Sequence, residues 1–221
     1  AGQQDPATQA ESIDALMASA KDAKIELPMA EALAPAVAAL AARSSGGLAE
    51  AGVRVAALAG DDQTAWSFSE AGASRSWQLL LAAADPKSEQ ARAALAEGVA
   101  VATKSQLPGA LLQRLVTVLD ALGEDIPIPL WDLAGKSPQP EDGYLPATGV
   151  LTSLKDASDK GEAGRTIILV ATALGPQGAA GAHLIALGDS IRALKRVGLD
   201  GAAQRIAVEA LYPHWPSRGK G

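Results

Sequence analysis

Residues 107–123, LPGALLQRLVTVLDALG, predict the broadest apolar helix in this chain. Leucine and valine side chains recur here at the spacing that places them on one face of an α-helix. Pro108 and Gly109 separate the segment from the residues before it, and Gly123 is of the residue type that most often follows the end of a helix. The apolar positions are Leu111, Leu112, Leu115, Val118, Leu119 and Leu122.

Helical spacing extends from this segment toward both ends of the chain. Gly, Pro and Asp or Ser pairs recur about every 12 to 20 residues, with no convincing strand pattern between them. Pro35 should kink or split its helix, and Asp85-Pro86 has the form of a cap followed by proline at the first helical position. Helices are expected at about 8–24, from Pro28 to the break at 44–47, at 48–58, after Asp61, after Asp85, and at about 146–158, 161–174, 182–197 and 200–212.

The composition favours helices that pack closely. Of the 221 residues, 48% are apolar and only 3% aromatic, and most of the apolar residues are Ala and Leu. Small and aliphatic side chains fill a core best where helices lie directly against one another. The sequence therefore predicts an all-α fold of antiparallel helical hairpins, which form a short superhelical array or an irregular bundle.

The character of the sequence changes after Gly123. Five prolines lie between Glu124 and Pro146, which makes this the longest stretch without a helical pattern. Long ordered loops are usually functional or connect domains. We therefore expect an N-terminal helical lobe over 1–123, a Pro-rich connecting loop over 124–145, C-terminal helical hairpins over 146–212 and a tail over 213–221.

The last predicted hairpin, at about 182–213, resembles one tetratricopeptide-type repeat. That family places Leu-Gly and a bulky residue on its first helix, glycine at the turn, small residues on its second helix and proline after it. The resemblance covers about 30 residues and implies an α-solenoid scaffold that binds other proteins, with no catalytic residue to carry over. The matching positions are Leu187, Gly188, Ile191, Gly198, Ala203, Ala207, Ala210 and Pro213.

Charge and residue counts exclude several classes of protein. The formal net charge of -6 and the pI of about 5.0 argue against nucleic-acid binding, which needs clustered basic residues. The basic group at 192–196 ends a predicted helix, where it complements the helix dipole. No run approaches the ~18 apolar residues of a membrane helix. The absence of cysteine excludes disulfides and thiolate metal sites.

Catalytic patterns are sparse. The two histidines, His183 and His214, have no metal-ligand spacing, and no serine lies in a nucleophile motif. We therefore assign no catalytic residue, metal or cofactor, and we leave open whether the chain is an enzyme. Glu124 or Glu141 beside Trp131 is the best carboxylate candidate, because sugar sites often combine acids with an aromatic side chain.

Two segments have the composition of a binding surface. Prolines restrict the segment around Trp131, which lowers the entropy lost on binding, and tryptophan is enriched among residues that dominate interfaces. Aromatic residues beside prolines also end the last helix. The predicted partner-binding residues are Ile126, Ile128, Leu130, Trp131, Leu133, Tyr212 and Trp215.

We conclude from the sequence that the chain is a non-enzymatic interaction or scaffold module for a protein or peptide partner. The alternatives are a glycan-acting or ligand-binding protein that uses carboxylates beside Trp131, and a structural subunit of a homo-oligomer or larger assembly. The polar start, AGQQDP, is typical of a chain after signal-peptide removal. We therefore expect a periplasmic or secreted protein of the bacterial envelope, with the cytoplasm as the alternative.

Overall fold

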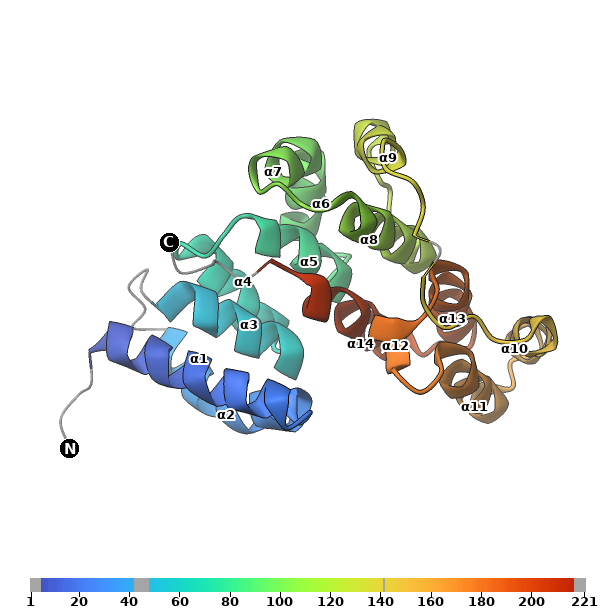
Figure 1. Cartoon of the computed structure of the whole chain (residues 1–221), viewed down its shortest axis with the longest axis horizontal. Helices are drawn as coiled ribbons and strands as arrows, with labels where there is room; N and C mark the ends of the chain where they lie inside the picture. The colour runs from blue at the N-terminus through green and yellow to red at the C-terminus, as the bar shows by residue number, and fades with distance from the viewer. Residues whose placement is uncertain (1–4, 42–47, 141, 217–221) are drawn as a thin grey trace. The chain divides into compact units, whose positions relative to one another are not determined.

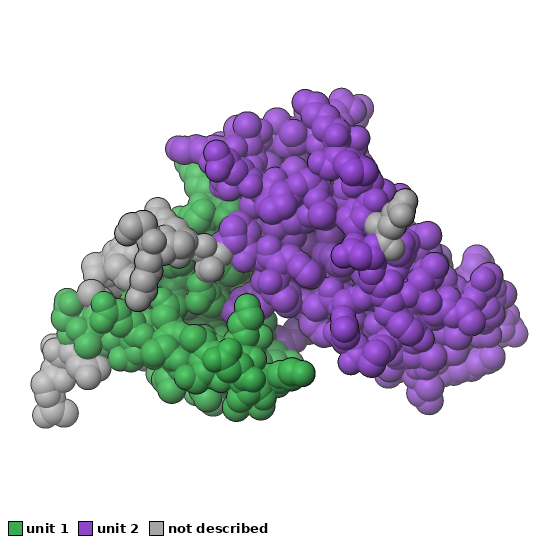
Figure 2. All heavy atoms as spheres, in the orientation of Figure 1, with its two compact units in different colours: residues 1–81, 218–221 green, residues 82–217 purple. Residues whose placement is uncertain are grey.

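The computed structural model describes residues 5–41, 48–140 and 142–216 of the chain. In this part the regular structure is helical, apart from one isolated parallel bridge between Tyr144 and Ala182 (Figure 1). The predicted all-α fold of packed helix pairs is therefore confirmed. The chain divides into two compact units between Leu81 and Ala82 (Figure 2), so that the predicted connecting segment, 124–145, lies within the second unit.

The first unit contains helices α1 to α4 and most of α5. Within it, α3 packs against α1, α2 and α4. Pro35 lies inside α2, which nevertheless continues to Ala41, so the helix is not split. The helices are α1 (Pro6–Asp22), α2 (Glu26–Ala41), α3 (Ala49–Ala59), α4 (Asp62–Glu70) and α5 (Ser76–Ala84), whose last turn crosses the division between the units.

Close contact between α3 and α4 depends on a glycine. A side-chain carbon added at Gly52 would lie 2.6 Å from the ring of the fully buried Phe68. A polar contact holds the segment before α5: the Ser74 amide donates to Glu50 Oε2 at 3.0 Å, and Trp77 Nε1 donates to Glu50 Oε1 at 2.7 Å. The Glu50 carboxylate on α3 thus accepts hydrogen bonds from two donors at the start of α5, one just before the helix and one in its first turn.

The second unit contains the remaining helices. Its central element is α13, which packs against α8, α10, α11 and α14. The helices are α6 (Glu89–Ala96), α7 (Gly98–Lys104), α8 (Gly109–Leu122), α9 (Ile128–Gly135), α10 (Thr148–Asp159), α11 (Ala163–Leu174), α12 (Gly178–Gly181), α13 (Leu184–Arg196) and α14 (Asp200–Leu211), followed by the 3-10 turn η2 (Tyr212–His214).

The Pro-rich segment contains a helix that its prolines had concealed. Pro127 precedes the first residue of α9 and Pro129 lies in its first turn. Proline is compatible with these positions because the first amide groups of a helix have no intrahelical acceptor. The expectation that this segment is non-helical was therefore wrong for Ile128–Gly135, which packs against α7 and α8 (Figure 1).

The start of α6 also differs from the sequence expectation. Asp85-Pro86 is not the cap of this helix; Ser88 is, and its side chain accepts a hydrogen bond from the Ala91 amide at 3.0 Å. Serine is as good a cap as aspartate, and its side-chain oxygen satisfies an otherwise unpaired amide of the first turn. The helix expected after Asp61 is capped by that residue, whose side chain accepts from the Thr64 amide at 3.1 Å, and Gly123 ends α8 in the left-handed conformation as expected.

Several contacts fix the short α12 segment. The Tyr144 amide donates to the Gly181 carbonyl at 2.8 Å, and the His183 amide donates back to the Tyr144 carbonyl at 3.0 Å. From α8, Arg114 donates to the Ala179 and Ala182 carbonyls at 3.3 and 3.2 Å. Burial lowers the pKa of the Arg114 guanidinium, and the nearby Asp142 partly offsets this effect. One side chain thus satisfies carbonyl groups at both ends of α12.

We predict that Gly52→Ala destabilises the protein. The added methyl group overlaps the buried Phe68 ring, and overpacking of this kind costs about 1–3 kcal/mol. Urea unfolding followed by circular dichroism measures the effect. Gly149→Ala is the control, because this exposed helical glycine has no neighbouring atom within 4 Å and should leave stability equal or raised by up to about 1 kcal/mol. Equal unfolding curves for both variants would contradict the close packing.

We predict that Arg114→Met lowers the free energy of unfolding by about 2–3 kcal/mol, because it leaves the Ala179 and Ala182 carbonyls without their charged donor. Arg165→Met provides the control. Arg165 is an exposed arginine that pairs with Glu162 three residues away, and such a pair contributes less than about 0.5 kcal/mol. The contribution of Arg114 is refuted if chemical denaturation gives the same loss for both variants.

Candidate functional site

An apolar groove of about 640 Å³ lies between α11 and α14 in the second unit. Its side chains are almost all aliphatic, and no carboxylate–histidine or serine–histidine pair lies among them. The lining residues are Ile167, Val170, Ala171, Leu174, Gly175, Gly178, Leu194, Leu199, Ala202, Arg205, Ile206 and Glu209.

The two walls of the groove have the same spacing. On α11 the lining positions are 167, 170, 171 and 174, and on α14 they are 202, 205, 206 and 209. Each set follows the i, i+3, i+4, i+7 spacing of one helix face. The floor includes Leu194 of α13, the helix that packs against both walls. The groove therefore exists because α13 holds α11 and α14 on either side of it.

The α12 segment closes one end of the groove. Gly175 and Gly178 line this end, where the last turn of α11 leads into α12. Gly178 has a φ of 62°, and a side-chain carbon there would lie 2.4 Å from Glu209 Oε1. Only glycine combines this backbone conformation with the approach of the carboxylate. Leu199, in the turn before α14, lines the opposite end.

Two charged side chains, Arg205 and Glu209, lie one helical turn apart on the α14 wall. Glu209 is exposed, but its Oε1 accepts a hydrogen bond from the Ala179 amide at 3.1 Å, which fixes the carboxylate beside α12. On the opposite wall, Ile167 leaves 50% of its surface exposed. The groove thus combines an open apolar surface with one acidic and one basic position.

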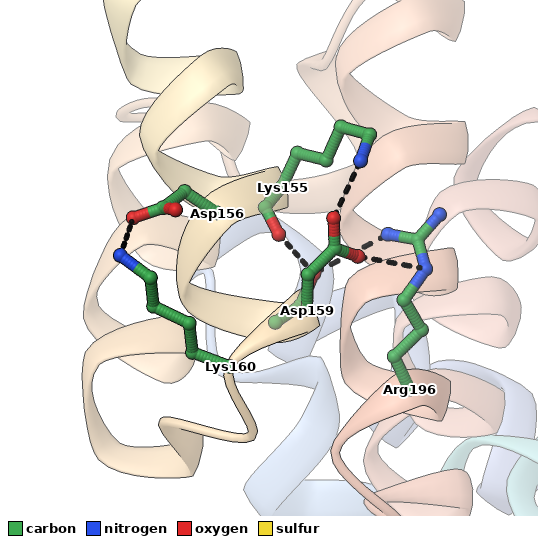
Figure 3. A network of polar contacts seen from close by, with 6 residues as sticks. Lys155, Asp156, Asp159, Lys160 and Arg196 are labelled. Atoms are coloured by element: carbon green, nitrogen blue, oxygen red, sulfur yellow. Dashed lines mark hydrogen bonds and ion pairs between the residues drawn. The ribbon is translucent and has the colours of Figure 1, made fainter.

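A second hollow, of about 340 Å³, lies between α10 and α13 and has a different character. Lys155, Asp189 and Arg196 line it together with Leu151, Thr152 and Leu154. Its two cations both reach Asp159, through Lys155 Nζ and through Arg196 Nε at 3.7 Å (Figure 3). The third charged residue of the lining, Asp189, pairs with Arg192 at 3.6 Å, so each of these charges already lies beside an opposite charge.

Around this second hollow, two ion pairs form within α10 and its C-cap, and Arg196 joins α10 to α13. The Lys155 hydrogen bond holds the pKa of Asp159 below its ordinary value, and Asp156, 2.8 Å from Lys160 Nζ, raises the pKa of that lysine (Figure 3). Arg196 Nη1 also donates to the Ser158 hydroxyl at 3.3 Å. Each charged side chain of this group thus lies beside an opposite charge or a hydrogen-bond partner. We therefore interpret the group as part of the folded structure and not as a ligand site.

The other basic residues at the end of α13 contact α8. Lys195 Nζ donates to the Leu122 carbonyl in the last turn of α8, and Arg192 pairs with Asp120 on the same helix. A cation at this position stabilises the helix whose carbonyl groups it meets. Lys195 and Arg196 also lie in the last turn of α13 itself, where the sequence predicted that they complement the helix dipole. The contacts with α8 depend on tertiary packing and were not predicted.

The predicted binding residues of the Pro-rich segment have mixed exposure. Ile128 and Trp131 lie on α9 with 74% and 41% of their surface exposed. Leu130 is fully buried, and Ile126 and Leu133 are half-buried. Because α9 is a helix, residues that follow one another in sequence point in different directions. Ile128 and Trp131 are thus the members of this set that are accessible on the surface.

The predicted binding residues at the end of α14 are less accessible. Tyr212 is half-buried and Trp215 is buried, while the neighbouring His214 is exposed and its Nε2 lies 3.1 Å from the Ala180 carbonyl. The 3-10 turn that contains Tyr212 packs against α12 and α14. The aromatic side chains of this segment therefore contribute to the folded unit.

The carboxylates proposed beside Trp131 have different outcomes. Glu141 lies outside the described residues, and Glu124 is half-buried after the end of α8. Burial raises the pKa of Glu124, an effect that Lys195 partly opposes.

In the described ranges no three His, Asp or Glu side chains are placed to hold a metal ion. Every helix described is too short or too polar to cross a lipid bilayer.

Sequence reasoning missed the α11–α14 groove. It identified both helices, but the exposed apolar positions on α11 look the same in the sequence as buried ones. Thr166 and Val170 are buried on α11, while Ile167 and Ile168 beside them are exposed. The continuous apolar run at 167–171, which leaves no polar position over more than one helical turn, was the available signal.

Comparison with known proteins gives no match. No protein family, no curated protein and no solved structure is similar to this chain.

We predict that Glu124→Gln stabilises the protein at pH values where the carboxyl of the folded chain is ionised, and has no effect in acid, where it is protonated. A carboxyl whose pKa is raised on folding favours the folded state while protonated, and this stability is lost as the pH rises through the folded pKa. The gain at pH 7.5 should stay below about 1 kcal/mol because the group is partly solvated. Urea midpoints at pH 3.5 and 7.5 measure it, with Asp132→Asn, which removes an exposed carboxylate on α9, as the control for charge. A gain of the same size at both pH values would contradict the burial effect.

Proposed function

We propose that this chain is a non-enzymatic interaction module that binds a protein partner through the groove between α11 and α14. The observation that supports this function is the open aliphatic groove itself, about 640 Å³ in volume and lined by residues from α11, α13 and α14. Aliphatic side chains of the groove are open to water, among them Ile167 with 50% of its surface exposed, and covering such side chains with a partner is favourable. The periplasm or the cell exterior is the proposed location.

The chemistry of the groove fits binding better than catalysis. Its polar side chains are Arg205 and Glu209, and the Glu209 carboxylate already accepts a backbone amide. A general acid or base would have to present a proton to a bound substrate, whereas this carboxylate supports the α12 segment. The predicted surface on α9, formed by Ile128 and Trp131, is proposed as a second contact region of the same module.

We expect that Ile206→Glu abolishes partner binding, because it places a charge among the aliphatic residues of the groove. A photo-crosslinking amino acid at position 167, introduced in the native cells, should capture one dominant protein. The same amino acid at position 185 is the matched control, because Ile185 lies on α13 outside the groove with 51% exposure, against 50% for Ile167.

The proposal fails if position 167 captures no protein. It also fails if the Ile206→Glu variant, with the same unfolding curve as the unmodified chain, still forms the captured complex to the same extent. Capture of a second copy of this chain at position 167 would instead support the structural-subunit alternative. A parallel experiment with Trp131→Ala separates the two surfaces, because it should weaken the complex only if α9 also contacts the partner.

A further inference from the structure

The groove favours one kind of occupant, an inference that rests on the proposed function. We infer that its partner is an amphipathic α-helix that lies antiparallel to α11 and α14, with a basic residue opposite Glu209 and an acidic residue opposite Arg205. This inference specifies the shape, the direction and the charge order of the bound segment. Each of the three follows from a separate feature of the groove.

The shape follows from the two walls. Both line the groove at i, i+3, i+4 and i+7: the α11 positions are all apolar, and on α14 Ala202 and Ile206 alternate with Arg205 and Glu209. Both wall helices lie against α13. Side chains of a third helix fit between two such rows because the ridges and grooves of helices repeat at the same spacing. The lining of each wall extends over eight residues, from 167 to 174 and from 202 to 209, which is about 10 Å of helix. A bound helix of about two to three turns would fill it and complete a four-helix arrangement around the groove.

The direction follows from the ends of the wall helices. Gly175 follows the last residue of α11, and Glu209 lies in the last turn of α14; both line the groove near α12. The carbonyl ends of both walls therefore meet at this end, where their partial negative charges and the Glu209 carboxylate add together. A helix that enters with its amino end here brings partial positive charge to this site. It then runs antiparallel to both walls.

The charge order follows from α14. Arg205 precedes Glu209 by one helical turn, and both side chains line the same wall. An antiparallel helix that passes this wall meets Glu209 first and Arg205 one turn later. Charge complementarity therefore requires a basic residue followed, four positions on, by an acidic residue on its α14-facing side. The reverse order would place like charges opposite one another at both positions.

We propose to test this inference with two synthetic helical peptides of about 14 residues. Both carry the same leucines at i, i+3, i+4 and i+7; one has Lys then Glu four positions apart beside the leucine face, and the other has the two exchanged. Fluorescence anisotropy with the whole chain should give at least about fivefold tighter binding for the Lys-then-Glu peptide. Arg205→Glu should remove this preference, and Ile185→Glu, outside the groove, should leave it unchanged.

The direction has its own measurement. The chain has no cysteine, so Ala202→Cys introduces a single thiol at the groove end opposite α12. The peptides carry their single cysteine as a thiopyridyl mixed disulfide, so that attack by the introduced thiolate joins peptide and chain and releases pyridinethione. This exchange should be faster with a Lys-then-Glu peptide that carries the activated cysteine at its carboxyl end than with one that carries it at its amino end. Equal rates, or a faster reaction at the amino end, would overturn the antiparallel direction.

Other outcomes overturn the inference and leave the proposed function standing. If position 167 captures a partner in cells but neither peptide binds, the partner is not a helix of this kind. Equal affinity for the two peptides would show that charge order plays no part. Binding of an apolar dye in the groove without binding of either peptide would favour a small apolar ligand over a protein helix.

Discussion

The packing of α13 is the constraint on which the second unit depends. This helix contacts α8, α10, α11 and α14, and most of its residues are buried. Its apolar side chains fill the space among these helices, and basic residues at its end reach α8 and α10. Because one helix supports four neighbours, the positions of the two groove walls are set by the side chains that α13 places between them.

A consequence of this arrangement is a surface that the chain itself does not cover. Helices α11 and α14 both bury one face against α13, and their outer apolar residues face each other across the groove. In the second hollow, by contrast, Lys155 and Arg196 both pair with Asp159 within the fold. The groove is therefore the feature whose apolar surface is best explained by a partner.

The α12 segment shows how polar contacts shape an apolar site. Arg114, Tyr144 and Glu209, which are distant in the sequence, all bond to backbone groups in or beside this short helix. Buried backbone groups need such partners, and a helix of one turn cannot supply them internally. These bonds fix the closed end of the groove and place the Glu209 carboxylate there, so the electrostatics of the site depend on the same contacts as its shape.

The sequence by itself determined the helical class, most helix positions and caps such as Asp61 and Gly123, because these depend on local spacing and on backbone groups a few residues apart. It missed α9, where prolines in the first turn resemble a loop, and the cap at Ser88. Only the tertiary structure decided that Leu130 is buried, that Ile167 is exposed and that Arg205 and Glu209 face a groove. Whether a side chain is buried depends on which helices pack against each other. These helices are distant in the sequence, so the local spacing of residues does not predict the contact.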